Sequence, residues 1–276
     1  MEHLDNEFKN SDNRIYFKDE LPPEDVFLKR FRISVAEFKK TGLKWADLRS
    51  IHSDYLVYKL DLETAAESIV KTLLTKEAKN AGVHSVRYRI KDAESLIAKI
   101  IRKKSSEKER LFTKDTYRSE ITDLIGIRAL HVFKNDWLNI DEFIRSKWKL
   151  KRGNPPIMYH RKGDSPDFIK LCKDNGCKVD EHPKEYRSIH YIILTSPGVK
   201  SINAEIQVRT IFEEGWSEID HKLRYSEKKG TSNPLDHYLS ILNRIAGSAD
   251  EIGSLIKKRD SELQKLKNEQ NDSTTI

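Results

Sequence analysis

The sequence predicts an α+β fold, in which β-strands and amphipathic helices share one core. The segment 205–209 (EIQVR) alternates polar and apolar residues with a period of two, as a strand with one buried face does. Directly after it, Phe212, Trp216, Ile219 and Leu223 recur at helical spacing. We expect this helix to pack its apolar side onto the sheet, so that polar groups of the strand and the helix meet at their junction.

Composition favours a globular chain with an anionic partner. The 276 residues include 51 Lys and Arg against 44 Asp and Glu, a net charge of +7, and 37% of them are hydrophobic. A basic balance suits nucleotides, nucleic acids or acidic proteins, although it also promotes solubility. No apolar run reaches membrane-spanning length and the N-terminus does not resemble a signal peptide, so we expect a cytoplasmic protein without membrane contact.

The N-terminal segment, residues 1–82, is predicted to be a polar arm followed by helices. The clearest helix is Leu60–Asn80, with Gly82 just beyond its end. Its expected core residues are Leu62, Ala65, Ile69, Leu73 and Ala78.

A second strand and helix follow in residues 83–104. Val86, Tyr88 and Ile90 alternate with cationic residues, and Asp92 can cap the helix that comes next. Leu96, Ile97, Ile100 and Ile101 would face inward. A hydroxyl and four cations would gather near the helix start: Arg89, Lys91, Ser95, Lys99 and Arg102. Such a group can hold a polyphosphate where, as here, the chain has no glycine-rich phosphate loop; the alternative is a solvated basic helix face.

Two carboxylates far apart in the sequence are the candidate metal ligands. Asp123 precedes the strand-like run 124–133, and Glu205 lies on the first strand described above. An Asp before a strand is usually a turn or cap residue. Paired with Glu205 on an adjacent strand, it would hold Mg²⁺ together with substrate phosphates.

The stretch 134–185 is the hardest to interpret. Trp137, Phe143 and Trp148 indicate a helix, a basic loop (KLKRGNPP) follows, and 164–184 is predicted to be mostly loop. The strand Ile189–Leu194 comes next. At its entrance, Tyr186 beside an Arg could stack on a base, or it could be an ordinary surface tyrosine.

Four blocks, RIKDAES…K, DLIGIR, YRSIH and EIQVRT…W…DHK, occur in this order and resemble the RelA/SpoT-type nucleotide pyrophosphokinase domain. The resemblance covers residues 83–225. It implies a nucleotidyltransferase-like fold with a mixed sheet of about five strands flanked by helices. It also implies transfer of pyrophosphate from ATP to the 3′-hydroxyl of GDP or GTP, which gives (p)ppGpp and AMP. The domain would be residues 83–230, with 231–276 as a C-terminal helix and polar tail.

The same resemblance assigns roles to individual residues. The ATP phosphates would contact Arg89, Lys91, Ser95, Lys99 and Arg102. Asp123 would bind Mg²⁺, and Glu205 would orient or deprotonate the attacking hydroxyl and share the metal. Tyr186 would stack on the acceptor base, and the other acceptor-side residues would be Arg187, Ser188, His190, Gln207, Arg209 and His221.

The chain departs from the family in ways that leave the acceptor open. Glu185 stands where small alarmone synthetases have a small residue before the Tyr, and the connection ahead of it is long. A toxin-type enzyme that modifies the 3′ end of tRNA is therefore the alternative, in which case an antitoxin would be a partner; the basic loop suits tRNA. No His-Asp dipeptide is present, so we expect a synthetase without the hydrolase half of long family members.

The C-terminal segment carries an apolar stripe at helical spacing. Its members are Leu235, Leu239, Leu242, Ile245, Ala249, Ile252, Leu255 and Ile256. We expect it to pack on the domain; assembly with a second copy of the chain is the alternative.

Overall fold

The computed structural model describes residues 20–196, 198, 201–224 and 235–273. The chain divides into two compact units, one comprising Met1–Glu63 and Ile90–Leu124 and the other Thr64–Arg89 and Ile125–Ile276. The first part of the predicted polar arm and the loop SEKKGTS lie outside the described residues.

The first unit is helical. It contains α1 (Glu24–Arg30), α2 (Val35–Thr41), the first part of α3 (Trp45–Leu73), α5 (Ala93–Ser106) and α6 (Tyr117–Glu120). The side chain of Asp92 accepts a 2.9 Å hydrogen bond from the backbone N–H of Ser95, which confirms the predicted cap of α5. The four residues expected on the inner side of α5 are all buried.

The predicted helix Leu60–Asn80 is part of a longer arrangement. Helix α3 begins already at Trp45 and ends at Leu73, and α4 (Lys76–Ala81) follows after a short break. Gly82 ends α4 with a φ of 113°, a conformation that favours glycine. The five residues predicted as the core of the helix Leu60–Asn80 are all buried, so the periodicity located the packed side correctly although the helix boundaries differ.

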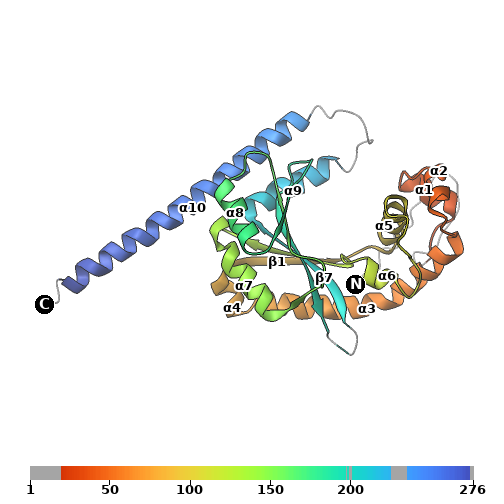
Figure 1. The fold of residues 1–276 in the computed structure, drawn as a ribbon, viewed down its shortest axis with the longest axis horizontal. Helices are drawn as coiled ribbons and strands as arrows, with labels where there is room; N and C mark the ends of the chain where they lie inside the picture. Colours follow the sequence, from red (N-terminus) through yellow and green to blue (C-terminus); the bar gives the residue numbers. More distant parts are fainter. Residues whose placement is uncertain (1–19, 197, 199–200, 225–234, 274–276) are drawn as a thin grey trace, which may run out of the picture. The chain divides into compact units, whose positions relative to one another are not determined.

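The second unit is built on a seven-stranded mixed sheet (Figure 1). The strands are β1 (Val83–Ile90), β2 (Ile125–His131), β3 (Lys149–Leu150), β4 (Ile157–His160), β5 (Lys178–Glu181), β6 (Ser188–Thr195) and β7 (Ile202–Thr210). Their order is β1-β2-β7-β6-β4-β5, and β3 pairs with β6. The mixed α+β fold is confirmed. The strands beyond the expected five include short ones in the stretch 149–181, where the sequence predicted loops over 149–156 and 164–184 and no strand.

That stretch also holds a helix that the sequence did not predict. This helix is α8 (Pro166–Asp174), which lies between β4 and β5. Before the stretch come 3₁₀ helix η1 (Lys134–Asp136) and the expected helix α7 (Trp137–Lys147). The side chain of Ser165 caps α8 and Pro166 occupies its first turn. The flanking strands β4 and β5 have only four residues each, too few for a clear alternation.

Strand β7 is the central element. It pairs in parallel with β2 and antiparallel with β6, and the register places Gly126 opposite Glu205 and His190 opposite Gln207. The predicted alternation is confirmed: Ile206 and Val208 are buried on one face. The polar residues of this alternation, Glu205, Gln207 and Arg209, therefore share the other face of the sheet and are called the polar row of β7 below.

Helix α9 (Ile211–Arg224) packs differently from the prediction. Trp216 is buried, but Phe212, Ile219 and Leu223 are each at least 40% exposed. The buried positions include Glu213 and Glu214 instead. The reason is electrostatic, because arginines on the neighbouring strands need carboxylates, and ion pairs outweigh the apolar spacing of this helix.

Helix α10 (Asp236–Ser273) runs beside α9, and its C-terminal part extends past the sheet (Figure 1). Its packed side includes Leu239, Asn243, Ala246 and Asp250, at spacings of four, three and four residues. Most of the predicted apolar stripe does not pack: Ile245, Ile252, Leu255 and Ile256 are all more than half exposed. The helix packs on α9 as expected and Leu239 is buried, but the rest of its buried side is partly polar and most of the stripe does not cover the domain. The helix also continues through most of the predicted polar tail.

No helix in the described parts of the chain is long and apolar enough to cross a membrane.

Candidate active site

The polar row of β7 forms one hydrogen-bonded chain with β6. The Nδ1 atom of His190 lies 3.2 Å from Oε1 of Glu205, and Gln207 Nε2 donates to Oε2 of the same carboxylate at 2.7 Å. Arg209 in turn donates to Oε1 of Gln207. Both oxygens of Glu205 are therefore oriented by neighbours, while about a sixth of its side chain stays exposed to reactants.

Tyr186 completes this chain at its other end. Its hydroxyl lies 3.1 Å from Nε2 of His190 and accepts a hydrogen bond from Arg209. The guanidinium of Arg209 also lies over the ring, 5.0 Å from the ring centre. Burial raises the pKa of the Tyr186 hydroxyl, although the charge of Arg209 opposes the shift. The structure thus brings together five predicted residues: Tyr186, His190, Glu205, Gln207 and Arg209.

Two further aromatic residues surround Tyr186 and were not predicted. The ring of Tyr159 on β4 lies 5.0 Å from that of His190 and 6.2 Å from that of Tyr186. The ring of His182 lies 5.3 Å from Tyr186. Both residues come from the stretch 134–185, whose short elements gave no pattern from which their position could be read.

Arg209 is buried and needs a counter-charge, which α9 supplies. Its Nη1 atom lies 3.1 Å from Oε2 of Glu214 and 3.1 Å from Oγ of Ser217. Glu214 also accepts a 2.8 Å hydrogen bond from Arg128 of β2, and Glu218 pairs with the same arginine. The sequence did not assign Arg128 to the site; its place two residues after Gly126 on β2, opposite Gln207, was the missing information.

Of the other predicted acceptor residues, Ser188 also interacts with the Tyr186 hydroxyl and opposes the rise in its pKa. Arg187 is buried and contacts Asp164 and Asn243, and Ser188 is buried and donates to the carbonyl of Val208. His221 lies on the exposed side of α9. Their roles at an acceptor remain predictions.

In the first unit, Asp123 is the centre of a cationic group. Its Oδ2 atom lies 2.9 Å from Nζ of Lys91 and 2.6 Å from Nζ of Lys99. Burial would raise the pKa of this carboxyl, but the two ammonium groups outweigh burial and hold the pKa below its ordinary value. Asp123 is therefore ionised at neutral pH.

The donor set at Asp123 fits a magnesium ion. Its second oxygen, Oδ1, is buried and has no hydrogen-bond partner among the described residues. An unpaired carboxylate oxygen beside ammonium groups suits a hard cation that also binds phosphate oxygens. Magnesium sites of this kind take one or two carboxylates from the protein and the rest from substrate, so the lack of a cluster of three acidic, His or Cys side chains in the described regions is compatible with it.

The remaining predicted phosphate ligands differ in their surroundings. Ser95 is exposed at the first turn of α5. Arg102 donates a 2.9 Å hydrogen bond to the carbonyl of Phe31, so part of its guanidinium holds the end of α1. Arg89 belongs to the second unit, where its side chain lies against Gly126.

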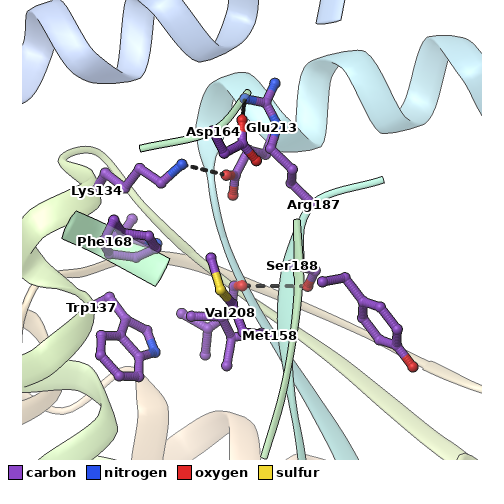
Figure 2. A pocket seen from close by; sticks show the side chains of 12 residues that line it. Lys134, Trp137, Met158, Asp164, Phe168, Arg187, Ser188, Val208 and Glu213 are labelled. Carbon is purple, nitrogen blue, oxygen red and sulfur yellow. Dashed lines mark hydrogen bonds and ion pairs between the residues drawn. The ribbon is translucent and has the colours of Figure 1, made fainter. Parts of the chain in front are cut away.

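A separate cavity of the second unit is too small for a nucleotide. Figure 2 shows Lys134 directed at Glu213, 3.7 Å away, and Arg187 beside Asp164 at 3.4 Å. The space that remains for a water-sized molecule is about 20 Å³, enough for roughly one water. Val208 lines this cavity, so the cavity lies on the face of β7 opposite the Glu205 side chain.

Comparison with known proteins agrees with the resemblance. The family described as "Region found in RelA / SpoT proteins" matches residues 88–230, just over half of the chain. The GTP pyrophosphokinase YwaC of Bacillus subtilis (strain 168) is 28% identical over 223 residues, which cover 77% of this chain and 94% of YwaC. The GTP pyrophosphokinase YjbM of the same organism is 25% identical over 199 residues, covering 71% of this chain and 82% of YjbM.

Solved structures share the fold. A GTP pyrophosphokinase family protein from Streptococcus pneumoniae has a TM-score of 0.57 at 22% identity, covering 77% of this chain and 97% of that protein. Small alarmone synthetase 1 from Bacillus subtilis has a TM-score of 0.57 at 20% identity, covering 75% and 98%. The match spans both of these proteins almost completely. Together with the GTP pyrophosphokinase relatives, the family match confirms the prediction of a nucleotide pyrophosphokinase of the synthetase type. The chain belongs to the RelA/SpoT family.

Proposed function

We propose that this protein transfers pyrophosphate from ATP to the 3′-hydroxyl of GDP or GTP, releasing AMP and (p)ppGpp. The observation that carries the proposal is the Glu205 carboxylate, oriented by His190 and Gln207 and partly open to solvent. Glu205 lies within residues 88–230, which match the family, and the relatives YwaC and YjbM are GTP pyrophosphokinases.

Glu205 is the proposed general base. The 3′-oxygen of the acceptor attacks the β-phosphorus of ATP, the bond from that phosphorus to the α,β-bridging oxygen breaks, and AMP leaves. The proton of the hydroxyl passes to Glu205. Because the hydrogen bonds of His190 and Gln207 hold the carboxylate before substrate arrives, little reorganisation is needed at this step.

The cationic residues supply charge neutralisation, on which phosphoryl transfer mainly depends. Lys91, Lys99 and Arg89 are proposed to contact the ATP phosphates, with Ser95 donating from the first turn of α5. Asp123 would hold Mg²⁺, which neutralises charge on the phosphate oxygens when bound.

Tyr186 is the proposed platform for the acceptor base. The rings of Tyr159, His182 and His190 surround Tyr186 next to the Glu205 row at centre-to-centre distances of 5.3 to 6.2 Å, all of them tilted or edge-on to it, so a base would stack on the single ring of Tyr186. Stacking accepts any base, so the identity of the acceptor depends on the residues around it.

The basic loop 149–156 favours tRNA as a second candidate acceptor, because phosphate contacts dominate such binding, and the residue before Tyr186 leaves the acceptor open. Glu185, directly before Tyr186, has a φ of 57°, a left-handed conformation in which family members are expected to carry a small residue. A tRNA 3′ end would present its terminal ribose hydroxyl to the same chemistry.

An acceptor screen tests both candidates. The protein is incubated with Mg²⁺ and γ-labelled ATP, and with GDP, GTP, ATP or deacylated tRNA in parallel. We expect labelled (p)ppGpp and an equal amount of AMP with GDP or GTP. Label on tRNA alone would select the toxin-type reaction, and the absence of label from every acceptor would overturn the proposal.

A further inference from the structure

The backbone on the N-terminal side of Tyr186 is held in an unfavourable conformation. Glu185 has a φ of 57°, and non-glycine residues seldom adopt the left-handed region unless their surroundings hold them there. A turn contact, the hydrogen bond from Glu185 N–H to the carbonyl of His182 at 2.9 Å, supports this geometry locally. The main restraint comes from a helix far away in the sequence.

That restraint is Asn243 of α10, which contacts both neighbours of Tyr186. Its Nδ2 atom donates to the carbonyl of Glu185 at 2.7 Å. Arg187 donates to the backbone carbonyl of Asn243 at 2.7 Å and also to its Oδ1 atom. The amide donates on one side and accepts on the other, so this orientation satisfies both partners. Asn243 is fully buried, and water cannot replace these bonds.

The guanidinium of Arg187 occupies space that a glycine leaves open. It is 4% exposed and lies 3.4 Å from Asp164. A Cβ atom on Gly247, one turn after Asn243, would stand 2.4 Å from Nη1 of Arg187. Glycine weakens a helix interior, so its presence at this position has a packing reason.

We infer that Asn243 and Gly247 are positioning residues for the acceptor site, through which α10 fixes the chain on both sides of Tyr186. This inference rests on the proposed function, in which Tyr186 binds the acceptor nucleoside. With Glu185 and Arg187 held, the ring of Tyr186 stays between Arg209 and His190. When the hydrogen bonds of Asn243 to Glu185 and Arg187 are lost, the ring of Tyr186 becomes mobile and acceptor binding weakens. The residues proposed to bind ATP keep their positions.

A pair of glycine substitutions on one helix tests the inference. Gly247→Ala forces Arg187 to move, whereas at Gly253 an added Cβ would meet only Phe133 at 3.9 Å, an ordinary contact. Both changes raise helix propensity equally. We expect Gly247→Ala to raise the KM for the acceptor by roughly tenfold, the effect of about one lost hydrogen bond to a charged group. The KM for ATP should stay unchanged, and Gly253→Ala should behave like the unmodified protein.

Asn243→Asp separates the two contacts of Asn243. The carboxylate still accepts from Arg187 but cannot donate to the carbonyl of Glu185. Hydrogen exchange of the backbone amides 182–188 should become faster in Asn243→Asp and in Gly247→Ala, but not in Gly253→Ala, and the acceptor KM should rise in both.

The outcomes distinguish a failure of this inference from a failure of the proposed pyrophosphokinase function. If the unmodified protein uses no acceptor, the proposed function fails. If it is active but Gly247→Ala and Asn243→Asp match Gly253→Ala in acceptor KM, the inference is overturned. Faster exchange at 182–188 without a change in acceptor KM would also overturn it. Should Asn243→Asp fail to fold, the matched glycine pair decides.

Discussion

The Nδ1 atom of His190 lies 3.2 Å from the Oε1 atom of Glu205, across the antiparallel strands β6 and β7. The same imidazole contacts the Tyr186 hydroxyl through Nε2 at 3.1 Å. One ring therefore connects the proposed base with the proposed acceptor platform. Its two nitrogens are both engaged, so the position of Glu205 and that of Tyr186 depend on each other.

Glu205→Gln should abolish most of the catalysis and leave the fold intact. The amide keeps the shape of the side chain but cannot take a proton, and general-base catalysis contributes roughly 100- to 10,000-fold in rate. We expect kcat to fall by that factor, with little change in the KM for either substrate, in a steady-state assay of AMP release. Thermal unfolding serves as the control for folding. Turnover close to that of the unmodified protein would remove Glu205 from the chemistry.

Asp123→Asn should change the response to magnesium. The substitution removes the charge that the proposed ion needs, while Lys91 and Lys99 lose a carboxylate partner and stay available for phosphate. We expect a higher Mg²⁺ concentration for half-maximal rate and a lower kcat, measured by titrating Mg²⁺ at saturating ATP. Asp115→Asn, on an exposed position of the same unit, is the matched control. An Asp123→Asn protein with the ordinary Mg²⁺ dependence would show that Asp123 does not serve the metal.

Glu214 and Glu218 both pair with Arg128, yet we expect very different costs of removal. Glu214 is buried and also neutralises Arg209, which is 1% exposed, so Glu214→Ala leaves a buried charge uncompensated. Such a loss costs about 3–5 kcal/mol of unfolding free energy. Glu218 is 36% exposed, and an exposed pair is worth about 0–1 kcal/mol. Urea denaturation of the two variants measures both values, and equal losses would contradict this assignment.

Asp250 should make the stability of the protein depend on pH. Burial and the nearby charge of Glu213 raise its pKa from 3.8 to about 7, while a hydrogen bond from Thr210 and the charges of Lys134 and Arg187 oppose the shift. The protonated form is thus favoured in the folded protein. Its stabilisation is complete below pH 3.8, decreases as the pH rises, and is lost above about 7.

Asp250→Asn removes this dependence, because the amide carries no charge to bury. At pH 8 the variant should be more stable than the unmodified protein by about 1–3 kcal/mol, the usual cost of a buried group without a full set of partners. Urea denaturation at pH 5 and pH 8 gives the comparison, with Asp260→Asn on the exposed side of α10 as the control. A variant that loses as much stability between the two pH values as the unmodified protein would contradict the raised pKa.

Features that depend on a few neighbouring residues were predictable. The alternation of β7, the cap of α5 by Asp92 and the buried positions of α3 and α5 all follow from local spacing. The membership in the RelA/SpoT family also came from short ordered blocks. The stretch 149–181 was not predictable, because strands of two to four residues are held by their neighbours in the sheet and carry too little pattern of their own.

The burial of α9 and α10 shows where local spacing misleads. Apolar residues at helical intervals indicated packed sides on both helices, yet Phe212, Ile219 and Leu223 of α9 and most of the predicted stripe of α10 are exposed. The helices instead bury carboxylates and an amide. These side chains face Arg209 and Arg187, and a buried charge must be compensated before apolar area can decide an orientation.

By itself, the sequence determined the strands and helices with clear periodicity, the family, and the candidate row of Glu205, Gln207 and Arg209. Only the tertiary structure decided which partners those side chains have: Glu214 for Arg209, and Asn243 for Arg187. The reason is physical. Periodicity is imposed by the backbone within a few residues, whereas the pairing of Arg187 with a residue 56 positions away depends on which groups packing brings together once water is excluded.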